Sequence, residues 1–454
     1  MPSPGTDPRA PGPGPAVFRL RGHTARDRAA QVLLRLHHPQ AERRSLTVQQ
    51  AVDAAIRRPP RLGPADAALL TELIYGSLRR DLRLRWLLHR YLRQPDKLPP
   101  AVRTILLVAS YELLHLDRVP AHATVNWAVQ AVRDNLGSGL AHLVNAVLRR
   151  ITRLGEAPRE DAWYAAQMTD SVERLAIVCS IPAWIVRLWL ESCGPETTEA
   201  LARAAGRTPW PAARINMARP GWETLRDALL QGEAQSVGSA GILFPPGRVF
   251  HDLSRLANDG ALSWQGAGSQ RLLHRLQADA WDGPVWDACA GRGGKTCALL
   301  EMGRDVRLAS DPHLARLQGL RQELDRLGLP HPELRQGQAQ ELDPGFIPRT
   351  VLLDVPCSGL GALARRPDTR LRQSLDQTKE LAAGQQAIID AAWGHLAPGG
   401  RLAYLTCTVN PAENEHQTAR LLTRPDARLE IEIPARPESH GEDSMYGVVV
   451  RKTQ

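Results

Sequence analysis

The sequence predicts a multidomain protein, in which an all-α N-terminal domain precedes an α/β domain with a doubly wound, mostly parallel sheet. Three observations support this fold class. The chain has 454 residues, enough for two to four domains at about 100–200 residues per domain. Apolar residues recur at helical spacing from about residue 24 to residue 152. Beyond about residue 260, short apolar strands alternate with helical segments, a pattern typical of a parallel sheet.

The N-terminal third divides into a tail and a helical domain. Residues 1–18 are predicted to be disordered, because a segment dominated by proline and glycine cannot bury a core. Residues 19–153 are predicted to be helical throughout. Leu69, Leu70 and Leu73 illustrate the helical spacing, and prolines mark the helix boundaries at positions 59, 60, 64, 99, 100 and 120.

Two further regions complete the predicted organisation. Residues 160–250 are predicted to form a small, mostly helical linking subdomain with one short strand at 214–216. Residues 251–454 are predicted to form the α/β domain. Its expected strands are 285–287, 306–310, 350–353 and 401–406, and an amphipathic helix is expected at 381–396.

The charge is concentrated at one end of the chain. The first 150 residues contain 23 basic and 11 acidic residues, whereas the remainder contains 34 and 37. This excess predicts a polyanionic partner such as nucleic acid. The alternative explanation of the many arginines is a codon bias of the genome, since only four of the 57 basic residues are lysine. No apolar run reaches the length of a membrane span and no signal peptide is evident, so we expect a cytoplasmic protein without a membrane partner.

The cysteines predict neither disulfides nor metal, and two of them indicate chemistry. Six cysteines without a CxxC pair or a zinc-like Cys/His cluster favour free thiols and no metal site. Cys357 and Cys407 each follow a predicted strand, and we expect both thiols to face one crevice at the carboxyl edge of the sheet. Cys179, Cys193 and Cys297 are interpreted as structural.

A glycine-rich turn predicts a ligand site. The segment DACAGRGGKT (287–296) lies between a predicted strand and helix, where glycines let backbone N–H groups approach a ligand closely. It matches neither GxGxxG nor the P-loop, and by itself it fits a dinucleotide, phosphate or nucleoside site or a simple tight turn. Asp311 ends the next strand, where a carboxylate can accept hydrogen bonds from a ribose diol, unless it is a solvated loop residue. Together these features predict a nucleoside-containing cofactor.

These motifs resemble those of the RsmB/Sun-type RNA cytosine-C5 methyltransferases. The glycine-rich turn is similar to the family's CAAPGGKT loop, DVPCSGLG (354–361) to its proline–cysteine motif, and LAYLTCTVNPAENE (402–415) to its threonine–cysteine motif. The helical domain resembles the NusB-like RNA-binding fold in ELIYGSLR (72–79), ASYELLHLDRVPAHATVN (109–126) and LVNAVLRR (143–150).

The resemblance implies methyl transfer from S-adenosylmethionine to carbon 5 of a cytosine in RNA, most specifically small-subunit (16S) rRNA. It assigns Cys407 as the nucleophile, Asp354 as the group that hydrogen-bonds or protonates N3 of the ring, and Cys357 to product release. The implied cofactor-binding residues are Cys289, Ala290, Gly291, Arg292, Gly293, Gly294, Lys295, Asp311, Gln338 and Asp354. RNA is the implied partner, with Arg79, Arg80, Arg83 and Arg85 as candidate phosphate contacts, or alternatively a solvated helix face.

The sequence departs from this family pattern at several positions. Gly291-Arg292 replaces Ala-Pro in the glycine-rich loop, and Gln338 stands where an Asp is usual. Gly266 replaces the Asp of a QDxAS-like segment, and Trp127 stands where a Glu is usual. The alternative function is therefore a NusB-like RNA-binding protein whose methyltransferase domain is catalytically impaired.

Overall fold

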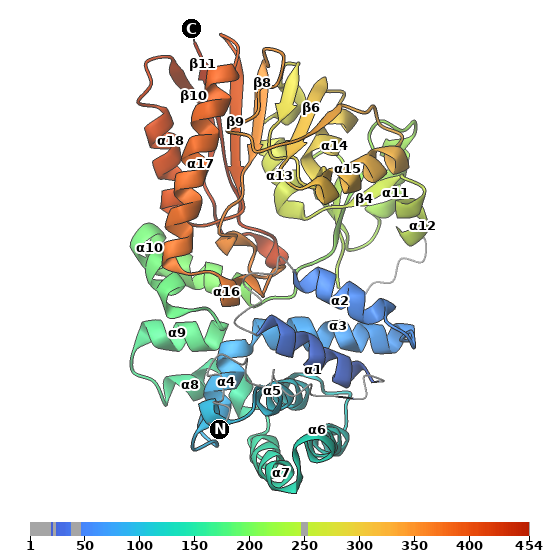
Figure 1. The fold of residues 1–454 in the computed structure, drawn as a ribbon, viewed down its shortest axis with the longest axis vertical. Helices are drawn as coiled ribbons and strands as arrows, with labels where there is room; N and C mark the ends of the chain where they lie inside the picture. The colour runs from blue at the N-terminus through green and yellow to red at the C-terminus, as the bar shows by residue number, and fades with distance from the viewer. Residues whose placement is uncertain (1–19, 21–23, 38–46, 247–252, 454) are drawn as a thin grey trace, which may run out of the picture. The chain divides into compact units, whose positions relative to one another are not determined.

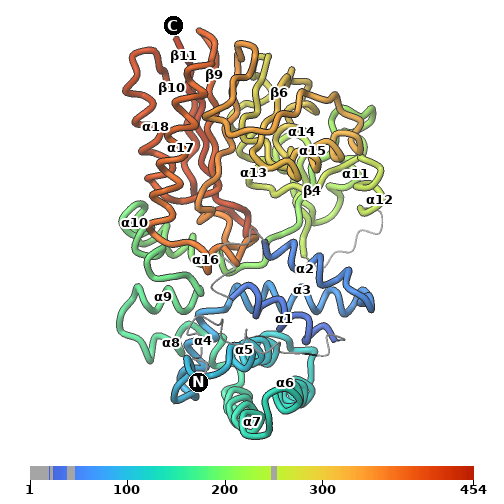
Figure 2. The backbone as a smooth tube through the Cα atoms, viewed as in Figure 1, coloured from blue at the N-terminus to red at the C-terminus, as the bar shows by residue number. Residues whose placement is uncertain are grey.

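The computed structural model describes residues 20, 24–37, 47–246 and 253–453 (Figure 1). The predicted tail, residues 1–18, lies outside the described residues. Contacts divide the chain into two compact units, Met1–Ser180 and Ile181–Gln454. Each unit is described by itself, and its path is followed most easily in the backbone trace (Figure 2). The boundary falls within the segment predicted as a linking subdomain.

The first unit is helical, as predicted. Its helix α5 (Pro100–His115) is the centre, because it is buried on nearly every side and packs against α1, α3, α4, α6 and α7. Prolines 64 and 100 are the first residues of their helices, where a fixed φ is favourable and no N–H is needed. The other helices are α1 (Ala25–Leu36), α2 (Val48–Arg57), α3 (Pro64–Arg79), α4 (Asp81–His89), α6 (Ala121–Leu136), α7 (Ser138–Thr152), α8 (Asp161–Ala165) and α9 (Ser171–Cys179).

Two of the four arginines proposed as phosphate contacts, Arg79 and Arg83, are buried and structural, so the prediction is wrong for these two. Arg83 is 6% exposed and donates hydrogen bonds to the Pro158 carbonyl at 2.7 Å and to the Tyr164 hydroxyl at 3.0 Å. Arg79 is also buried, and Arg85 pairs with the buried carboxylate of Asp81 at 2.7 Å. Burial lowers the pKa of Arg80. Arg79 and Arg83 therefore stabilise helix contacts, whereas Arg80 and Arg85 are half-buried and their contact with phosphate stays a prediction.

The second unit begins with a helix and a small antiparallel sheet. Helix α10 (Ala183–Ala205) starts after Pro182 and is kinked at Gly194. Only one strand was predicted here, but four form a sheet in the order β2-β3-β1-β4. They are β1 (Ala212–Ile215), β2 (Gln235–Val237), β3 (Gly241–Leu243) and β4 (Leu262–Trp264), accompanied by α11 (Trp222–Leu229) and α12 (Leu253–Asn258). Strands of three or four residues are too short to show alternation.

Among the described helices, no single one is both long enough and apolar enough to cross a membrane. Only α9 and α10, taken together as a bent pair, satisfy length and composition.

The larger sheet has seven strands in the order β10-β11-β9-β8-β5-β6-β7. The strands from β5 to β9 are parallel, and β11 runs antiparallel to both of its neighbours. All four predicted strands are confirmed, two with one further residue. The strands are β5 (Val285–Asp287), β6 (Val306–Asp311), β7 (Glu333–Gln336), β8 (Thr350–Asp354), β9 (Arg401–Thr406), β10 (Ala427–Ile433) and β11 (Tyr446–Lys452).

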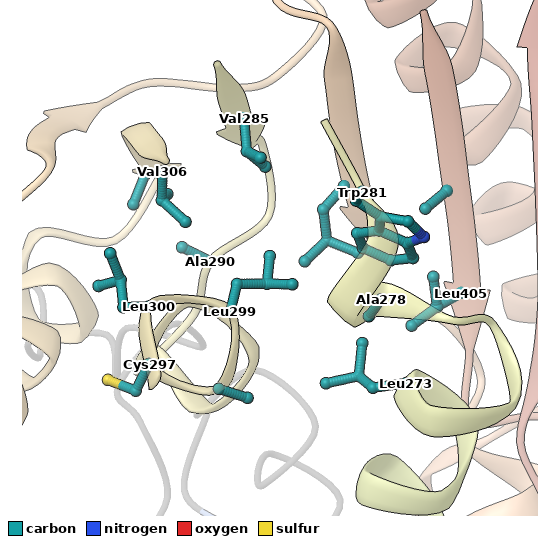
Figure 3. Close-up of a cluster of buried hydrophobic side chains, with 14 of the residues drawn as sticks. Leu273, Ala278, Trp281, Val285, Ala290, Cys297, Leu299, Leu300, Val306 and Leu405 are labelled. Atoms are coloured by element: carbon teal, nitrogen blue, oxygen red, sulfur yellow. The ribbon is translucent and has the colours of Figure 1, made fainter. Parts of the chain in front are cut away.

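Helices cover both faces of this sheet, which confirms the doubly wound fold (Figure 1). Alternate side chains of β9 face opposite ways: Leu405 joins the core under α13, α14 and α15, and Tyr404 joins the core under α17 and α18. Figure 3 shows the first core, with Trp281 and Ala278 near Leu405. The helices are α13 (Ala267–Arg275), α14 (Gly294–Glu301), α15 (Leu314–Leu327), α16 (Thr369–Arg372), α17 (Leu375–His395) and α18 (Glu415–Leu421).

Candidate active site

The predicted site residues meet where the strand order reverses. From β5 the chain proceeds outward to β6 and β7, and then returns to β8 on the other side of β5. The loops after β5 and β8 therefore diverge, and such a divergence opens a crevice at the carboxyl edge of a parallel sheet. Across it, Lys295 Nζ of the glycine-rich segment lies 2.5 Å from Asp354 Oδ2 at the end of β8.

The glycine-rich loop is closely packed on one side and open on the other. Gly291 and Gly293 have φ values of +57° and +85°, which favour glycine. A Cβ at Gly293 would lie 2.0 Å from Leu320 Cδ1 of α15, whereas a Cβ at Gly291 would meet nothing within 4 Å. Arg292, which replaces a proline of the family pattern, lies against Gly319 of α15, where the missing side chain makes room for its guanidinium.

Asp311 lies directly beside this loop. Its carboxylate is buried and accepts the N–H of Gly291 at 3.2 Å and the N–H of His313 at 2.8 Å. Gln338 is exposed in the loop after β7, and the preceding Gly337 donates to the Asp311 carbonyl at 3.3 Å. A buried carboxylate, an open glycine backbone and a nearby amide together fit a nucleoside-containing group.

A buried carboxylate that the sequence analysis did not single out supports the start of α14. Asp287, at the end of β5, accepts a hydrogen bond from the Thr296 hydroxyl at 2.6 Å. Burial raises the pKa of Asp287 to about 7. No sequence signal separates this aspartate from Asp311 or Asp354, because the difference arises from its surroundings.

The two thiols lie together, as expected from their positions after adjacent strands. Cys357 Sγ is 3.4 Å from Cys407 Sγ, and the backbone N–H of Cys407 lies 3.3 Å from Cys357 Sγ. The hydrogen bond from Cys357 lowers the pKa of Cys407, and the positive charge of Arg366 acts in the same direction. The same hydrogen bond, together with burial, raises the pKa of Cys357 well above its ordinary value. This environment favours a thiolate at Cys407 and a thiol at Cys357.

Glu413 holds the two cysteine loops together, although sequence reasoning assigned it no role. Its carboxylate is fully buried and accepts from the Ser358 N–H at 2.8 Å and the Ser358 hydroxyl at 2.5 Å. It also accepts from Gln385 of α17 at 3.0 Å and from Asn410 at 2.9 Å. One side chain thus joins the loop after β8, the loop after β9 and α17.

Comparisons with known proteins agree with this geometry. The family described as 16S rRNA methyltransferase RsmB/F matches residues 274–447, and the NusB family matches residues 23–153. The chain is 34% identical over 394 residues to the probable ribosomal RNA small subunit methyltransferase B of Synechocystis sp., covering 84% of this chain and 86% of that protein. It is 32% identical over 400 residues to the ribosomal RNA small subunit methyltransferase B of Klebsiella pneumoniae, covering 84% and 87%.

The fold is also similar to that of a solved structure. A methyltransferase homologue from Pyrococcus horikoshii has a TM-score of 0.54 at 21% identity, covering 63% of this chain and all of that one. The helical unit contains the residues that match the NusB family, and the parallel sheet lies within the residues that match the methyltransferase family. The chain therefore belongs to the RsmB/F family of 16S rRNA methyltransferases, as an S-adenosylmethionine-dependent RNA methyltransferase with a NusB-family domain on its N-terminal side.

Proposed function

We propose that this enzyme methylates carbon 5 of a cytosine in small-subunit rRNA through a covalent adduct with Cys407. The observation that carries the proposal is the pair of thiols, 3.4 Å apart, on the loops that follow β8 and β9. Carbon 5 of cytosine is too weak a nucleophile to take a methyl group directly. A thiolate that adds to carbon 6 makes carbon 5 enamine-like and divides one difficult step into easier ones.

Asp354 is the proposed partner of the cytosine ring. Lys295 engages its Oδ2, and Oδ1 has no hydrogen-bond partner within the described part of the chain. When the Cys407 sulfur bonds to carbon 6, electron density moves into the ring, and Asp354 in its protonated form stabilises that density by donating a hydrogen bond or its proton to N3. S-adenosylmethionine, held by residues 289–295, Asp311, Gln338 and Asp354, supplies the methyl group.

Release of the product requires that carbon 5 lose its proton and that the bond between the Cys407 sulfur and carbon 6 break. A water molecule takes the proton from carbon 5, the electron pair of that C–H bond restores the double bond between carbons 5 and 6, N3 returns its proton to Asp354, and Cys407 leaves as a thiolate. We assign Cys357 to this release step, because its thiol is the group in hydrogen-bond contact with the Cys407 sulfur. The target base must be single-stranded or flipped to reach these groups.

We keep the predicted division into an RNA-docking domain at 19–153, a linking subdomain at 160–250 and a methyltransferase domain at 251–454, and we place the reaction in the cytoplasm. The alternative is an RNA-binding protein with an impaired methyltransferase domain. The juxtaposed thiols and the adjacent Lys295–Asp354 pair count against it, since a domain without chemistry needs neither arrangement.

The test is methyl transfer from labelled S-adenosylmethionine to unmodified small-subunit rRNA. We expect transfer by the wild type, no transfer by Cys407→Ala, and accumulation of a denaturation-resistant protein–RNA adduct by Cys357→Ala. Cys193→Ala, which changes a thiol of α10, is the matched control and should behave like the wild type. A wild-type protein that neither binds the cofactor nor transfers methyl would contradict the proposal.

A further inference from the structure

An arginine near the thiol pair is held along one edge by a buried carboxylate. Arg365 follows the short helical turn η5 (Leu360–Ala362), and its Nε lies 3.2 Å and 3.0 Å from the two carboxylate oxygens of Asp443. Its Nη2 also bonds Asp443. The side chain of Asp443 is 3% exposed, whereas that of Arg365 is 42% exposed. The carboxylate therefore serves as a fixed anchor for a guanidinium that is partly open.

Backbone contacts tie this pair to the loop that carries Cys407. The Gly361 N–H donates to the Cys407 carbonyl at 3.0 Å, and the Ser444 N–H donates to the Gly361 carbonyl at 2.9 Å. A Cβ at Gly361 would lie 2.0 Å from the Ser444 carbonyl oxygen, so the approach requires glycine. The negative charges of Cys407 and Asp354 add to that of Asp443 in raising the pKa of Arg365. Arg365 therefore belongs to the same site as the thiols.

The hydrogen-bonding geometry of Arg365 leaves donors available. A guanidinium carries five N–H groups in a rigid planar fork. Asp443 occupies the edge formed by Nε and Nη2, and Nη1 has no hydrogen-bond partner among the residues that the structure describes. Donors that remain exposed on a segment tied to the Cys407 loop are suited to an oxygen acceptor on a bound nucleotide.

We propose, on the basis of the methyl transfer proposed above, that Arg365 donates to an oxygen of the target nucleotide and that Asp443 is the positioning residue that holds it. The acceptor is either O2 of the cytosine or an oxygen of the adjoining phosphate. Charge reaches O2 when the thiolate adds to carbon 6, so a donor there would stabilise the transition state. A phosphate contact would instead contribute to RNA binding.

In this proposal, Asp443 takes the place of the aspartate that the QDxAS-like segment lacks at position 266. A Cβ at Gly266 would lie 3.6 Å from Arg365 Nε and 3.7 Å from Asp443 Oδ2. A carboxylate at position 266 would therefore reach the guanidinium that Asp443 holds. Gly266 has a φ of −57° and is the N-cap of α13, a position that aspartate favours, so the backbone accepts this substitution. In this chain the anchor comes from the segment before β11.

The first test removes the guanidinium without leaving a buried charge. The double variant Arg365→Gln/Asp443→Asn is compared with the wild type in single-turnover methyl transfer at saturating RNA. Loss of about 100-fold or more, with S-adenosylmethionine binding and melting temperature retained, supports a contact with O2. Weaker RNA binding with the saturated rate retained supports a phosphate contact, and a methylphosphonate at that phosphate should then weaken wild-type binding equally. Unchanged rate and binding would overturn the proposal.

The second test moves the carboxylate that holds Arg365 from position 443 to position 266. Asp443→Asn should lower the quantity that the first test identifies, either the saturated transfer rate or the affinity for RNA, and Gly266→Asp/Asp443→Asn should recover at least part of that loss. Absence of recovery in a folded double variant contradicts the positioning role. Arg451→Gln is the matched control, because Arg451 pairs with Glu430 at the opposite end of β9 from Cys407. If the wild type transfers no methyl group, the proposed function fails, whereas wild-type transfer with unaffected Arg365 variants rejects only this inference.

Discussion

The two site cysteines show how identical side chains acquire different roles from their surroundings. Cys407 accepts a hydrogen bond from Cys357 and lies near the positive charge of Arg366, so its pKa is lowered. Cys357 is the donor in that hydrogen bond and lies near the negative charge of Glu413, so its pKa is raised. The lower pKa belongs to the residue proposed as the nucleophile, since the thiolate is the reactive form.

This difference predicts a pH effect. In Cys357→Ala, Cys407 loses the hydrogen bond that lowers its pKa, so its thiolate should form only at higher pH. The acid limb of adduct formation should therefore move upward compared with that of methyl transfer by the wild type. The rates are measured in single-turnover experiments from about pH 5 to 9, the range in which perturbed and ordinary thiols titrate. An acid limb at the wild-type position would show that Cys357 does not influence Cys407.

At the residue scale, the positions of residues within one short motif could be predicted from the sequence. Cys357 and Cys407 lie together at the carboxyl edge of the sheet as predicted, because a strand end followed by a characteristic residue is a local signal, whereas their roles stay predictions. The anchor Asp443 could not be found in this way. It lies 78 residues from Arg365 in sequence, and only the antiparallel addition of β11 beside β9 brings it close.

At the scale of elements, the buried parallel strands were predictable and the edge strands were not. β8 and β9 are almost continuously apolar, whereas β7 (Glu333–Gln336) is largely polar and exposed at the edge of the sheet. Helix α17 begins at Leu375 and not at the predicted residue 381, because Ser374 and Gln377 form a capping box there. Its first turns are polar, so the apolar pattern began later than the helix.

The side chain of Glu413 accepts hydrogen bonds from the loop after β8, the loop after β9 and helix α17. Glu413→Ala would leave buried donors of Ser358, Gln385 and Asn410 without an acceptor. We expect the free energy of unfolding to fall by about 3–5 kcal/mol, and methyl transfer to fall with it. Urea denaturation and the transfer assay measure the two effects. Glu415→Ala is the control, since Glu415 lies two residues away but is exposed, and equal stability of both variants would refute the role of Glu413.

At the scale of the whole molecule, each unit has its own core, and the predicted fold class of each is confirmed. The concentration of basic residues in the first third remains to be assigned to a surface, because Arg79 and Arg83 are buried and Arg80 and Arg85 are half-buried. Arg149, Arg150 and Arg153, at the end of α7, are exposed, and their side chains form no ion pair among the described residues. They are better candidates for contacts with RNA phosphates.

Replacement of these three arginines by glutamine tests this assignment. Affinity for rRNA should fall, and the slope of log affinity against log salt should decrease by up to about three, one for each lost phosphate contact. Fluorescence anisotropy at several salt concentrations measures both quantities. Arg203→Gln is the control, because Arg203 already pairs with Glu199. An unchanged slope in the triple variant would exclude this surface.

The short distance between Cys357 and Cys407 also makes the active site vulnerable to oxidation. The two sulfurs are 3.4 Å apart, only about 1.4 Å more than the length of a disulfide bond. A two-electron oxidant that takes up two electrons and two protons would join the proposed nucleophile to the residue proposed to assist its release, and neither could then react with cytosine. We therefore expect an added oxidant to inactivate the enzyme and a thiol reductant to restore it.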